Sequence, residues 1–350
     1  MTNTVPIRVG IIGFGLAGRV FHAPFIATNP AFALAAIATS DVARAAQARE
    51  AHPAAEIMST DALLERAAVG DLDLVVVASP PHAHREQALA ALEAGAAVVI
   101  DKPFAPSVAD AEAIIAAADA AQRPLAVFQN RRFDGDFRTV TRLVDSGVLG
   151  TVHRFESTFE RFGAPKRDQW QGQISPAQGG GILFDLGSHL IDQALTLFGP
   201  ATLEVAELRA VREGLGSEDD AFISLRHDSG VRSHLTMSRV AAQSGPRFRV
   251  LGDESGYSVY GLDGQEPDLK VGRWPGSAGY GATAEADWGV LGVDYGDQPL
   301  QPVPTDLGGY PDFYARVAES IRHGTPMPVD ARDALETVRI IEAAHALSGL

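Results

Sequence analysis

Asp185 and His189 are the residues of this chain whose types and spacing most directly suggest chemistry. They follow a run of glycines, residues 179–181, and lie four positions apart. In a helix this spacing puts both side chains on one face, so the carboxylate and the imidazole could reach one ligand together. An imidazole with a nearby acid is the usual means of moving a proton near neutral pH. A structural interpretation stays equally open, with Asp185 as a helix N-cap and His189 as a packed polar residue.

Lys102 is the candidate cation for the same chemistry. It follows an apolar segment, residues 96–100, that predicts a buried strand, and the fixed φ of Pro103 stiffens the turn after it. An ammonium group there could polarise a substrate hydroxyl and lower its pKa. The alternative is a surface lysine in a loop, which is what most lysines are. The position at a strand end favours the functional interpretation.

A glycine-rich loop near the N-terminus could bind the phosphates of a nucleotide. Residues 7–12 are apolar and rich in β-branched types, which predicts a buried strand, and a helical pattern follows the loop. In a GxGxxG loop the first glycine permits a tight turn, the second admits a pyrophosphate and the third lets the helix pack closely. The helix N-terminus then favours an anion. The predicted contacts are Gly13, Phe14, Gly15, Leu16, Ala17 and Gly18.

Ser40 and Asp41 follow the next predicted strand, residues 32–39, and bear on the choice of dinucleotide. Asp41 lies near the distance at which an acid hydrogen-bonds the ribose hydroxyls of NAD, and its charge would repel the 2′-phosphate of NADP. It could also cap the helix that begins near residue 42, and one residue could do both. Ser40 and Arg44 could accept the extra phosphate. The carboxylate nevertheless favours NAD over NADP.

Strands and helices alternate through the first 128 residues. Strand patterns occur at 72–78, 96–100 and 125–128, with helical patterns at 84–93 and 108–121. This alternation predicts an α/β fold with a doubly wound parallel sheet. Ligands of such sheets bind beyond the carboxyl ends of the strands, where Gly13, Asp41, Pro80 and Lys102 all fall. The same strand ends add further candidate cofactor contacts: Ser79, Pro80, His84 and Asp101.

The pattern changes at about residue 150. Apolar and polar residues alternate in segments 152–160, 203–211, 221–226 and 231–237. This predicts a C-terminal α/β domain with a large, mostly antiparallel, open-faced sheet. Helices are expected at 187–198, 310–323 and 331–347, and long loops at 261–304. We therefore expect a dinucleotide-binding domain at 1–128 and a substrate-binding and oligomerisation domain at 129–350, with the last helix a candidate to pack back on the first domain.

Composition excludes several classes of protein. At 350 residues two domains are the default, and 46% hydrophobic with 21% charged residues is ordinary for a globular chain. A net charge of −15 opposes binding to nucleic acid or to an anionic membrane. There is no cysteine, no HExxH and no compact third metal ligand, so no metal is expected. No signal peptide or membrane-spanning run is recognisable, which favours a cytoplasmic location.

The order of these motifs resembles the glucose–fructose oxidoreductase, inositol dehydrogenase and MocA family over essentially the whole chain. The resemblance rests on GxGxxG, on Lys102-Pro103 at a strand end, and on GGGxxxDxGxHxxD at 179–192. The family usually has Glu-Lys-Pro where this chain has Asp at position 101. The resemblance implies a Rossmann domain, then an α/β domain whose open sheet often makes a dimer or tetramer interface. It also implies a catalytic group of Lys102, Asp185 and His189.

A closer resemblance is to the subgroup that contains scyllo-inositol dehydrogenases, carried by segments 21–24, 129–134, 167–170 and 192–193. It implies reversible oxidation of a secondary alcohol on a cyclic polyol or sugar. His189 would take the hydroxyl proton, Lys102 would polarise the oxygen, and Asp185 would orient the substrate or the base. The substrate contacts implied are Arg131, Arg132, Arg167, Asp168 and Trp170.

Other interpretations stay open at this point. Arg131 and Arg132 could instead form ion pairs between the domains. NADP-using members of the subgroup tend to carry Arg at the position of Asp41, which supports NAD here. The substrate could be a keto-sugar or a dihydrodiol, because fold and catalytic residues do not separate these. A nucleotide-sensing regulator on this scaffold would be expected to lose the catalytic group, which this chain retains.

Overall fold

The computed structural model describes residues 5–163 and 174–349, and the chain divides into two compact units. The first unit consists of residues 1–129, 267–278 and 310–335. The second unit consists of residues 130–266, 279–309 and 336–350. Two later segments of the chain therefore return to the unit that the N-terminal half builds.

The described residues of the first unit form a six-stranded parallel sheet with the order β3-β2-β1-β4-β5-β6. The strands are β1 (Ile7–Ile12), β2 (Phe32–Ala38), β3 (Glu56–Met58), β4 (Leu74–Val77), β5 (Ala97–Asp101) and β6 (Leu125–Phe128). Each neighbouring pair is parallel. The order reverses between β1 and β4, which is the doubly wound topology expected from the sequence. This prediction is confirmed.

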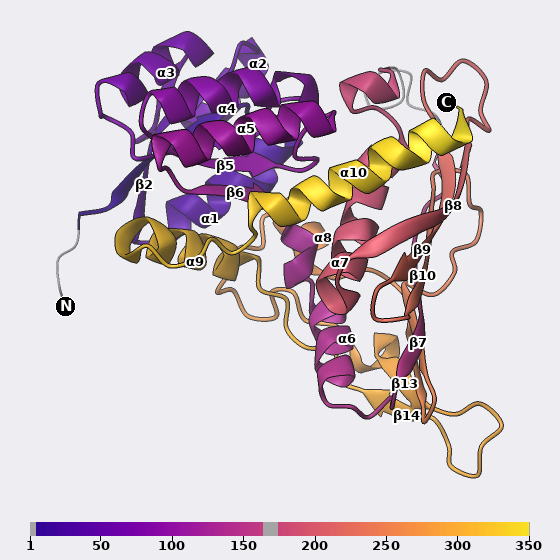
Figure 1. The fold of residues 1–350 in the computed structure, drawn as a ribbon. Coiled ribbons are helices and arrows are strands. Elements are labelled where there is room, and N and C mark those ends of the chain that lie inside the picture. The colour runs from indigo at the N-terminus through magenta and orange to yellow at the C-terminus, as the bar shows by residue number, and fades with distance from the viewer. Residues whose placement is uncertain (1–4, 164–173, 350) are drawn as a thin grey trace. The chain divides into compact units, whose positions relative to one another are not determined.

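Helices cover both faces of this sheet (Figure 1). They are α1 (Ala23–Thr28), α2 (Val42–Ala51), α3 (Thr60–Ala68), α4 (His84–Glu93), α5 (Val108–Ala121) and α9 (Tyr310–His323). Figure 1 shows α3, α4 and α5 side by side on one face, with α1 and α9 on the other. All four residues of β4 are buried, because a strand covered on both faces has no polar side. The short β3, which the sequence pattern did not predict, is partly exposed.

The second unit, within residues 130–163 and 174–349, is built on an eight-stranded mixed sheet with the order β14-β13-β12-β11-β7-β10-β9-β8. The strands are β7 (Val152–Glu160), β8 (Ala201–Arg209), β9 (Asp220–His227), β10 (Arg232–Ser238), β11 (Phe248–Gly252), β12 (Gly256–Val259), β13 (Gly289–Gly292) and β14 (Gln301–Val303). β7 and β10 are parallel, and the other neighbouring pairs are antiparallel. The mostly antiparallel sheet predicted from the sequence is confirmed.

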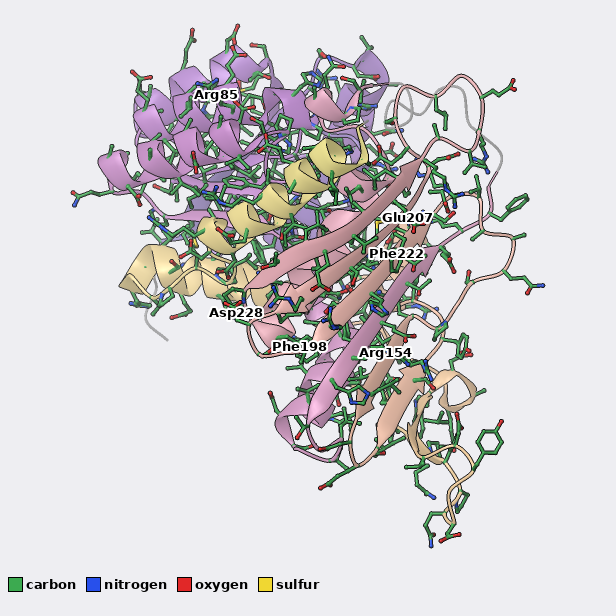
Figure 2. All side chains as sticks on the ribbon, turned by 45° about the vertical axis from the view of Figure 1, so that its right-hand side comes forward. Arg85, Arg154, Phe198, Glu207, Phe222 and Asp228 are labelled. Carbon is green, nitrogen blue, oxygen red and sulfur yellow. The ribbon has the colours of Figure 1, made fainter. Side chains whose placement is uncertain are left out.

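Helices pack on one face of this sheet. They are α6 (Gly135–Asp145), α7 (Ser188–Phe198) and the later turns of α10 (Ala331–Ser348). The residues of α8 (Gln265–Lys270) are divided between the two units. The core beneath them is aromatic and aliphatic, with Phe155, Phe159 and Phe248 almost fully buried. Figure 2 shows the opposite face, from which Arg154 and Phe222 project. Alternate residues of β7 are buried, as one covered and one open face require.

The segment 261–304 differs from the expectation of long loops, because α8, β13 and β14 lie within it. These elements have three to six residues each, too few for a hydrophobic period to show. β13 pairs with β12 and β14 pairs with β13, and the local sequence does not reveal these partners. In the described part of the chain, every helix is too short or too polar to span a lipid bilayer.

Candidate active site

The glycine loop after β1 has a different steric environment at each glycine. Gly13 has φ +99°, and an added Cβ would lie 2.5 Å from the Ala78 carbonyl oxygen. At Gly18 an added Cβ would lie 2.1 Å from the carbonyl oxygen of Gly13. Both positions therefore require glycine. At Gly15 the nearest atom is Arg44 Nη1 at 3.8 Å, so space for a ligand is open there.

The helix that follows the loop begins with a π-helical segment, Ala17–His22, and continues as α1. Of the predicted loop contacts, Phe14 is buried, while Leu16 is exposed. Free backbone amides at a helix N-terminus together with an open glycine fit the pyrophosphate of a dinucleotide. The residues present therefore fit the predicted cofactor.

Asp41 occupies the N-cap of α2, one of the two roles left open by the sequence. Its Oδ1 accepts the Arg44 backbone N–H at 2.9 Å. This hydrogen bond is the main reason that the pKa of Asp41 is lowered, so the carboxylate is ionised at neutral pH. Its Oδ2 lies 3.9 Å from Nε of Arg44, and both side chains are about half exposed. Capping leaves the carboxylate at the end of β2, where the ribose of a dinucleotide is expected.

His84, a predicted cofactor contact, is buried in the structure. Its Nε2 lies 2.9 Å from the Ser79 carbonyl oxygen and its Nδ1 lies 3.2 Å from that of Phe104. Burial lowers its pKa. Ser79 itself donates to Gln87 at 2.7 Å. His84 thus connects the loop after β4 to the loop after β5, where Lys102 lies.

Asp101 is the last residue of β5 and Lys102 directly follows it, at the same end of the sheet as the glycine loop. Asp101 faces a buried histidine, His22, whose Nε2 is 3.2 Å from Asp101 Oδ1. The peptide bond between Lys102 and Pro103 is cis. The parallel sheet of the first unit therefore brings together the predicted strand-end residues Gly13, Asp41, Ser79, Pro80, Asp101 and Lys102.

In the second unit, the helix of Asp185 and His189 starts earlier than predicted. A π-helical segment, Leu183–Gly187, leads into α7, and such segments are frequent at functional sites. Asp185 lies inside the first turn, so the N-cap alternative for Asp185 is excluded. The buried Glu218 fills that role, because its Oε1 accepts the Leu183 N–H at 3.0 Å.

Glu218 is also a reason why the last residue of the glycine run must be glycine. An added Cβ at Gly181 would lie 2.1 Å from Oε1 of Glu218, and Gly181 has φ +99°. His345 of α10 lies on the other side of the carboxylate, with Nε2 at 3.4 Å from Oε2. Its ring stacks on Phe184, one residue before Asp185. Glu218 and His345 therefore fix the start of the helix, which sequence reasoning did not identify.

Asp185 forms an ion pair with Arg239, which follows β10. The distance from Arg239 Nη2 to Asp185 Oδ2 is 2.5 Å, and each side chain is about one-quarter exposed. His189 is only 4% exposed. One helix thus carries a partly exposed, oriented carboxylate and a largely buried imidazole. Arg239 was missed by the sequence analysis, because nothing in the local pattern distinguishes it from the other arginines near strand ends.

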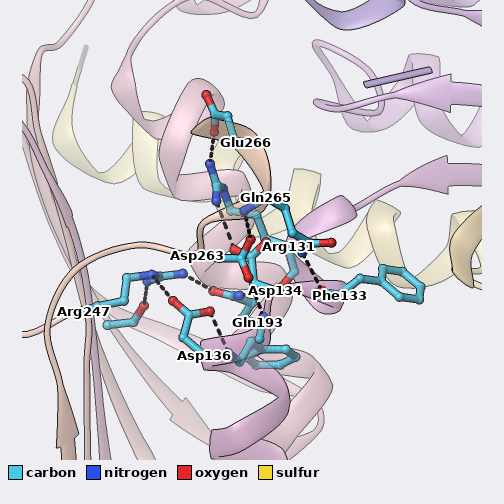
Figure 3. Close-up of polar contacts among 12 residues, drawn as sticks. Arg131, Phe133, Asp134, Asp136, Gln193, Arg247, Asp263, Gln265 and Glu266 are labelled. Carbon is cyan, nitrogen blue, oxygen red and sulfur yellow. Dashed lines mark hydrogen bonds and ion pairs between the residues drawn. The ribbon is translucent and has the colours of Figure 1, made fainter. Parts of the chain in front are cut away.

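Arg131 and Arg132, predicted to contact substrate, form ion pairs within the second unit. Arg132 binds Asp192 through two parallel hydrogen bonds of 2.8 and 2.7 Å. Arg131 pairs with Asp134 at 3.0 Å and with Glu266 at 2.7 Å (Figure 3). These contacts support an ion-pair role, although inside one unit rather than between domains as the sequence alternative supposed. Arg167, Asp168 and Trp170 lie outside the described residues.

The interaction at the centre of this network was also missed. Arg247, only 2% exposed, donates from Nη2 to Gln193 at 2.7 Å and from Nη1 to Ser157 at 2.7 Å. Gln193 in turn donates to the Arg131 carbonyl oxygen at 2.9 Å. These contacts join the residue directly before β11 to β7, to α7 and to the segment before α6, and Figure 3 shows Arg247, Gln193 and Arg131 among them. Helix α7, which carries His189, is therefore fixed by buried polar contacts as well as by apolar packing.

Two carboxylates beside this network have raised pKa values. Burial raises the pKa of Asp263 to about 7, with further contributions from the charges of Asp134 and Asp136. Burial likewise raises the pKa of Asp136 to about 6, opposed by Arg247 at 3.7 Å. Among the described residues, no group of three His, Asp or Glu side chains is placed to hold a metal ion.

Comparison with known proteins identifies the family. Residues 7–129 match the oxidoreductase family with an NAD-binding Rossmann fold, and residues 137–258 match the GFO/IDH/MocA C-terminal domain. The chain belongs to the GFO/IDH/MocA family. It is an NAD(P)-dependent dehydrogenase that acts on CH–OH groups. The resemblance inferred from the motifs is confirmed.

Individual relatives cover nearly the whole chain. The scyllo-inositol 2-dehydrogenase (NADP(+)) IolW of Bacillus subtilis is 34% identical and aligns over 97% of this chain and 92% of its own. The uncharacterized oxidoreductase YdgJ of Escherichia coli is 38% identical over 96% of this chain and 94% of its own. A solved Bacillus subtilis structure, named as the oxidoreductase yvaA, has a TM-score of 0.91 at 32% identity, covering 98% and 96%.

The steric roles of the glycines lead to a first prediction. Gly18→Ala should destabilise the protein by about 2 kcal/mol, because its methyl group meets the Gly13 carbonyl. Gly15→Ala should leave thermal stability nearly unchanged and weaken dinucleotide binding, because its methyl group enters the open space. Thermal denaturation and fluorescence titration with NAD and NADP measure the two effects. Equal losses of melting temperature in both variants would contradict this assignment.

The raised pKa of Asp263 predicts a pH dependence of stability. The unfolded chain releases this proton near the ordinary pKa of 3.8, but the folded protein holds it to about pH 7. This contribution is therefore complete below pH 4 and is lost as the pH rises to 7, a fall of at most about 4 kcal/mol. Denaturant unfolding at several pH values measures it.

Asp263→Asn should reduce that dependence, even though it replaces one of the two oxygens that accept the backbone N–H groups of Gly135 and Gln265. Asp228→Asn, on an exposed turn, changes the same charge and serves as the control. A pH dependence that is identical in wild type and Asp263→Asn would contradict the assignment of this effect to Asp263.

Proposed function

We propose that this protein is an inositol-type dehydrogenase, which interconverts a secondary alcohol and a ketone on a cyclic polyol or sugar. The observation that carries the proposal is the helix with Asp185 and His189. It combines a buried imidazole with a carboxylate oriented by Arg239, in a chain that also has Lys102 at a strand end of the dinucleotide sheet. The similarity to a scyllo-inositol 2-dehydrogenase supports the choice of substrate class.

Each proposed catalytic residue has a distinct role. A bound nicotinamide dinucleotide supplies the hydride acceptor or donor of the reaction. His189 takes the hydroxyl proton during oxidation and returns it during reduction, as a positioned imidazole can. Lys102 donates a hydrogen bond to the reacting oxygen and stabilises the negative charge that develops on it. Asp185, fixed by Arg239, orients the substrate or His189.

The two halves of the chain divide this work. We assign dinucleotide binding to residues 1–128 and substrate binding with oligomerisation to residues 129–350. In the substrate domain, Arg167, Asp168 and Trp170 stay candidates for contacts with vicinal hydroxyls and an apolar sugar face. The ion pairs of Arg131 and Arg132 favour a supporting role for these two residues.

We further propose a homodimer or homotetramer formed through the open face of the eight-stranded sheet. This face carries Phe222, which lies beside Glu207 of the neighbouring strand, and, further along the sheet, Arg154 (Figure 2). Arg154 pairs with Glu156 on the same strand at 3.0 Å. Aromatic and arginine side chains among paired charges are typical of protein interfaces.

A substrate screen with matched variants tests the function. The wild type should reduce NAD or NADP with an inositol or a related cyclic sugar. Lys102→Ala and His189→Ala should each lower kcat by about 100-fold or more, consistent with loss of a general base or an electrostatic partner. Dinucleotide binding and thermal stability, measured on the same samples, should persist in Lys102→Ala. Unchanged turnover in both variants would refute the mechanism, and no reduction with any polyol or sugar would refute the substrate class.

We propose NAD as the preferred cofactor, because the ionised Asp41 opposes a 2′-phosphate. Asp41→Asn keeps an oxygen to cap α2 but removes the charge. It should lower the NAD-to-NADP ratio of kcat/KM by about tenfold. Asp41→Arg should change the ratio further in the same direction. A wild type that prefers NADP, or a ratio unaffected by both substitutions, would show this choice of cofactor to be wrong.

A further inference from the structure

His22 is a fully buried histidine whose two ring nitrogens both have polar partners. Nδ1 lies 2.6 Å from the hydroxyl oxygen of Tyr314, and Nε2 lies 3.2 Å from Oδ1 of Asp101. The ring also packs 4.6 Å from the ring of Phe128, centre to centre. All these residues belong to the first unit. A buried polar ring with two matched partners has a fixed orientation.

The hydrogens of this chain of contacts follow from the chemistry of the groups. The carboxylate of Asp101 only accepts, so Nε2 of His22 must carry a hydrogen and donate it to Oδ1. Tyr314 is fully buried, which raises the pKa of its hydroxyl well above the ordinary value. It therefore keeps its proton and satisfies Nδ1. The contact from His22 to Asp101 is thus directional.

The three residues connect elements that the cofactor and the reaction depend on. His22 is the last residue of the π-helical segment whose start forms the phosphate-binding turn. Tyr314 belongs to α9, and Asp101 is the final residue of β5, directly before Lys102. The Asp101 side chain is 15% exposed, while that of His22 is fully buried. The chain of contacts therefore ends at the residue that precedes Lys102.

We propose that His22, supported by Tyr314, is a positioning residue for Lys102 and acts through Asp101. Lys102 needs a defined backbone position if its ammonium group is to meet a developing charge, because misplacement by even 1 Å is costly in catalysis. Asp101 is held at two points: its backbone is part of β5, and its carboxylate accepts a hydrogen bond from His22. This inference rests on the proposed function only where turnover is the readout.

Two substitutions of His22 separate its two contacts. In His22→Asn the side-chain amide lies near the position of Nδ1. This variant therefore keeps the contact with Tyr314 and loses the hydrogen bond to Asp101. Gln extends to the position of Nε2, so His22→Gln can still donate to Asp101. Both remove the ring from Phe128, so both should lose stability to a similar extent. We expect His22→Asn to lower kcat about tenfold with an unchanged KM for the dinucleotide, and His22→Gln to restore most of it.

A second readout does not need turnover. The chain has three lysines, Lys102, Lys166 and Lys270, so labelling with an amine-reactive reagent and peptide mass spectrometry resolves each. Lys270 is exposed and serves as the internal reference. In His22→Asn the labelling rate of Lys102 relative to Lys270 should rise about threefold or more, because the segment loses an anchor and opens locally. In His22→Gln the ratio should stay close to that of the wild type.

His227→Asn is the matched control for loss of a buried histidine. His227 also has two ring contacts, at 2.8 Å from the Gly199 carbonyl oxygen and 2.8 Å from Ser233 Oγ, but it belongs to the second unit. It should lower the melting temperature without changing the Lys102 labelling ratio. The inference is overturned if His22→Asn and His22→Gln lose kcat equally, or if the labelling ratio is the same in both. If the wild type shows no turnover with any substrate, the proposed function fails, while the labelling still decides the role of His22.

Discussion

The hydrogen bonds and the ion pair of the buried Arg247 guanidinium are the interactions on which the packing of the second unit around α7 depends. A charge removed from water is tolerated only where partners replace the lost hydration. Arg247 finds them in Ser157, Gln193 and Asp136, so strands β7 and β11 must meet helix α7 in one geometry. Apolar packing alone would allow α7 to slide or rotate, because it has little directionality. Hydrogen-bonded charges remove that freedom.

In the first unit, buried histidines fix neighbouring elements in a similar way. His84 connects the loops after β4 and β5, and His22 connects the end of β5 to α9. Each has a ring nitrogen facing an oxygen acceptor. Because imidazole is rigid, such a contact fixes both position and orientation. The loops that carry the candidate cofactor contacts and Lys102 are thus connected to neighbouring elements through buried histidines.

The polar network also has a cost. Asp136 and Asp263 lie close enough to other carboxylates and far enough from water that their pKa values rise to about 6 and about 7. At a given pH each carboxyl group is therefore less ionised in the folded protein than in the unfolded chain. Retaining them is consistent with a need for a defined arrangement around α7 and the segment before α6 rather than for maximum stability. The hydrogen bond from Gly135 to Asp263 shows what is gained, since it fixes the start of α6.

The sequence by itself determined what depends on near neighbours in the chain. The apolar runs of β1 and β4, the spacing of Gly13 and Gly18, and the alternation of β7 are local patterns, and the structure agrees with them. Only the tertiary structure decided the partners of the candidate site. Arg239 lies 54 residues from Asp185, and Tyr314 lies 292 residues from His22. Such pairs cannot be predicted from local sequence patterns, because a hydrogen bond depends on distance in space and not on spacing along the chain.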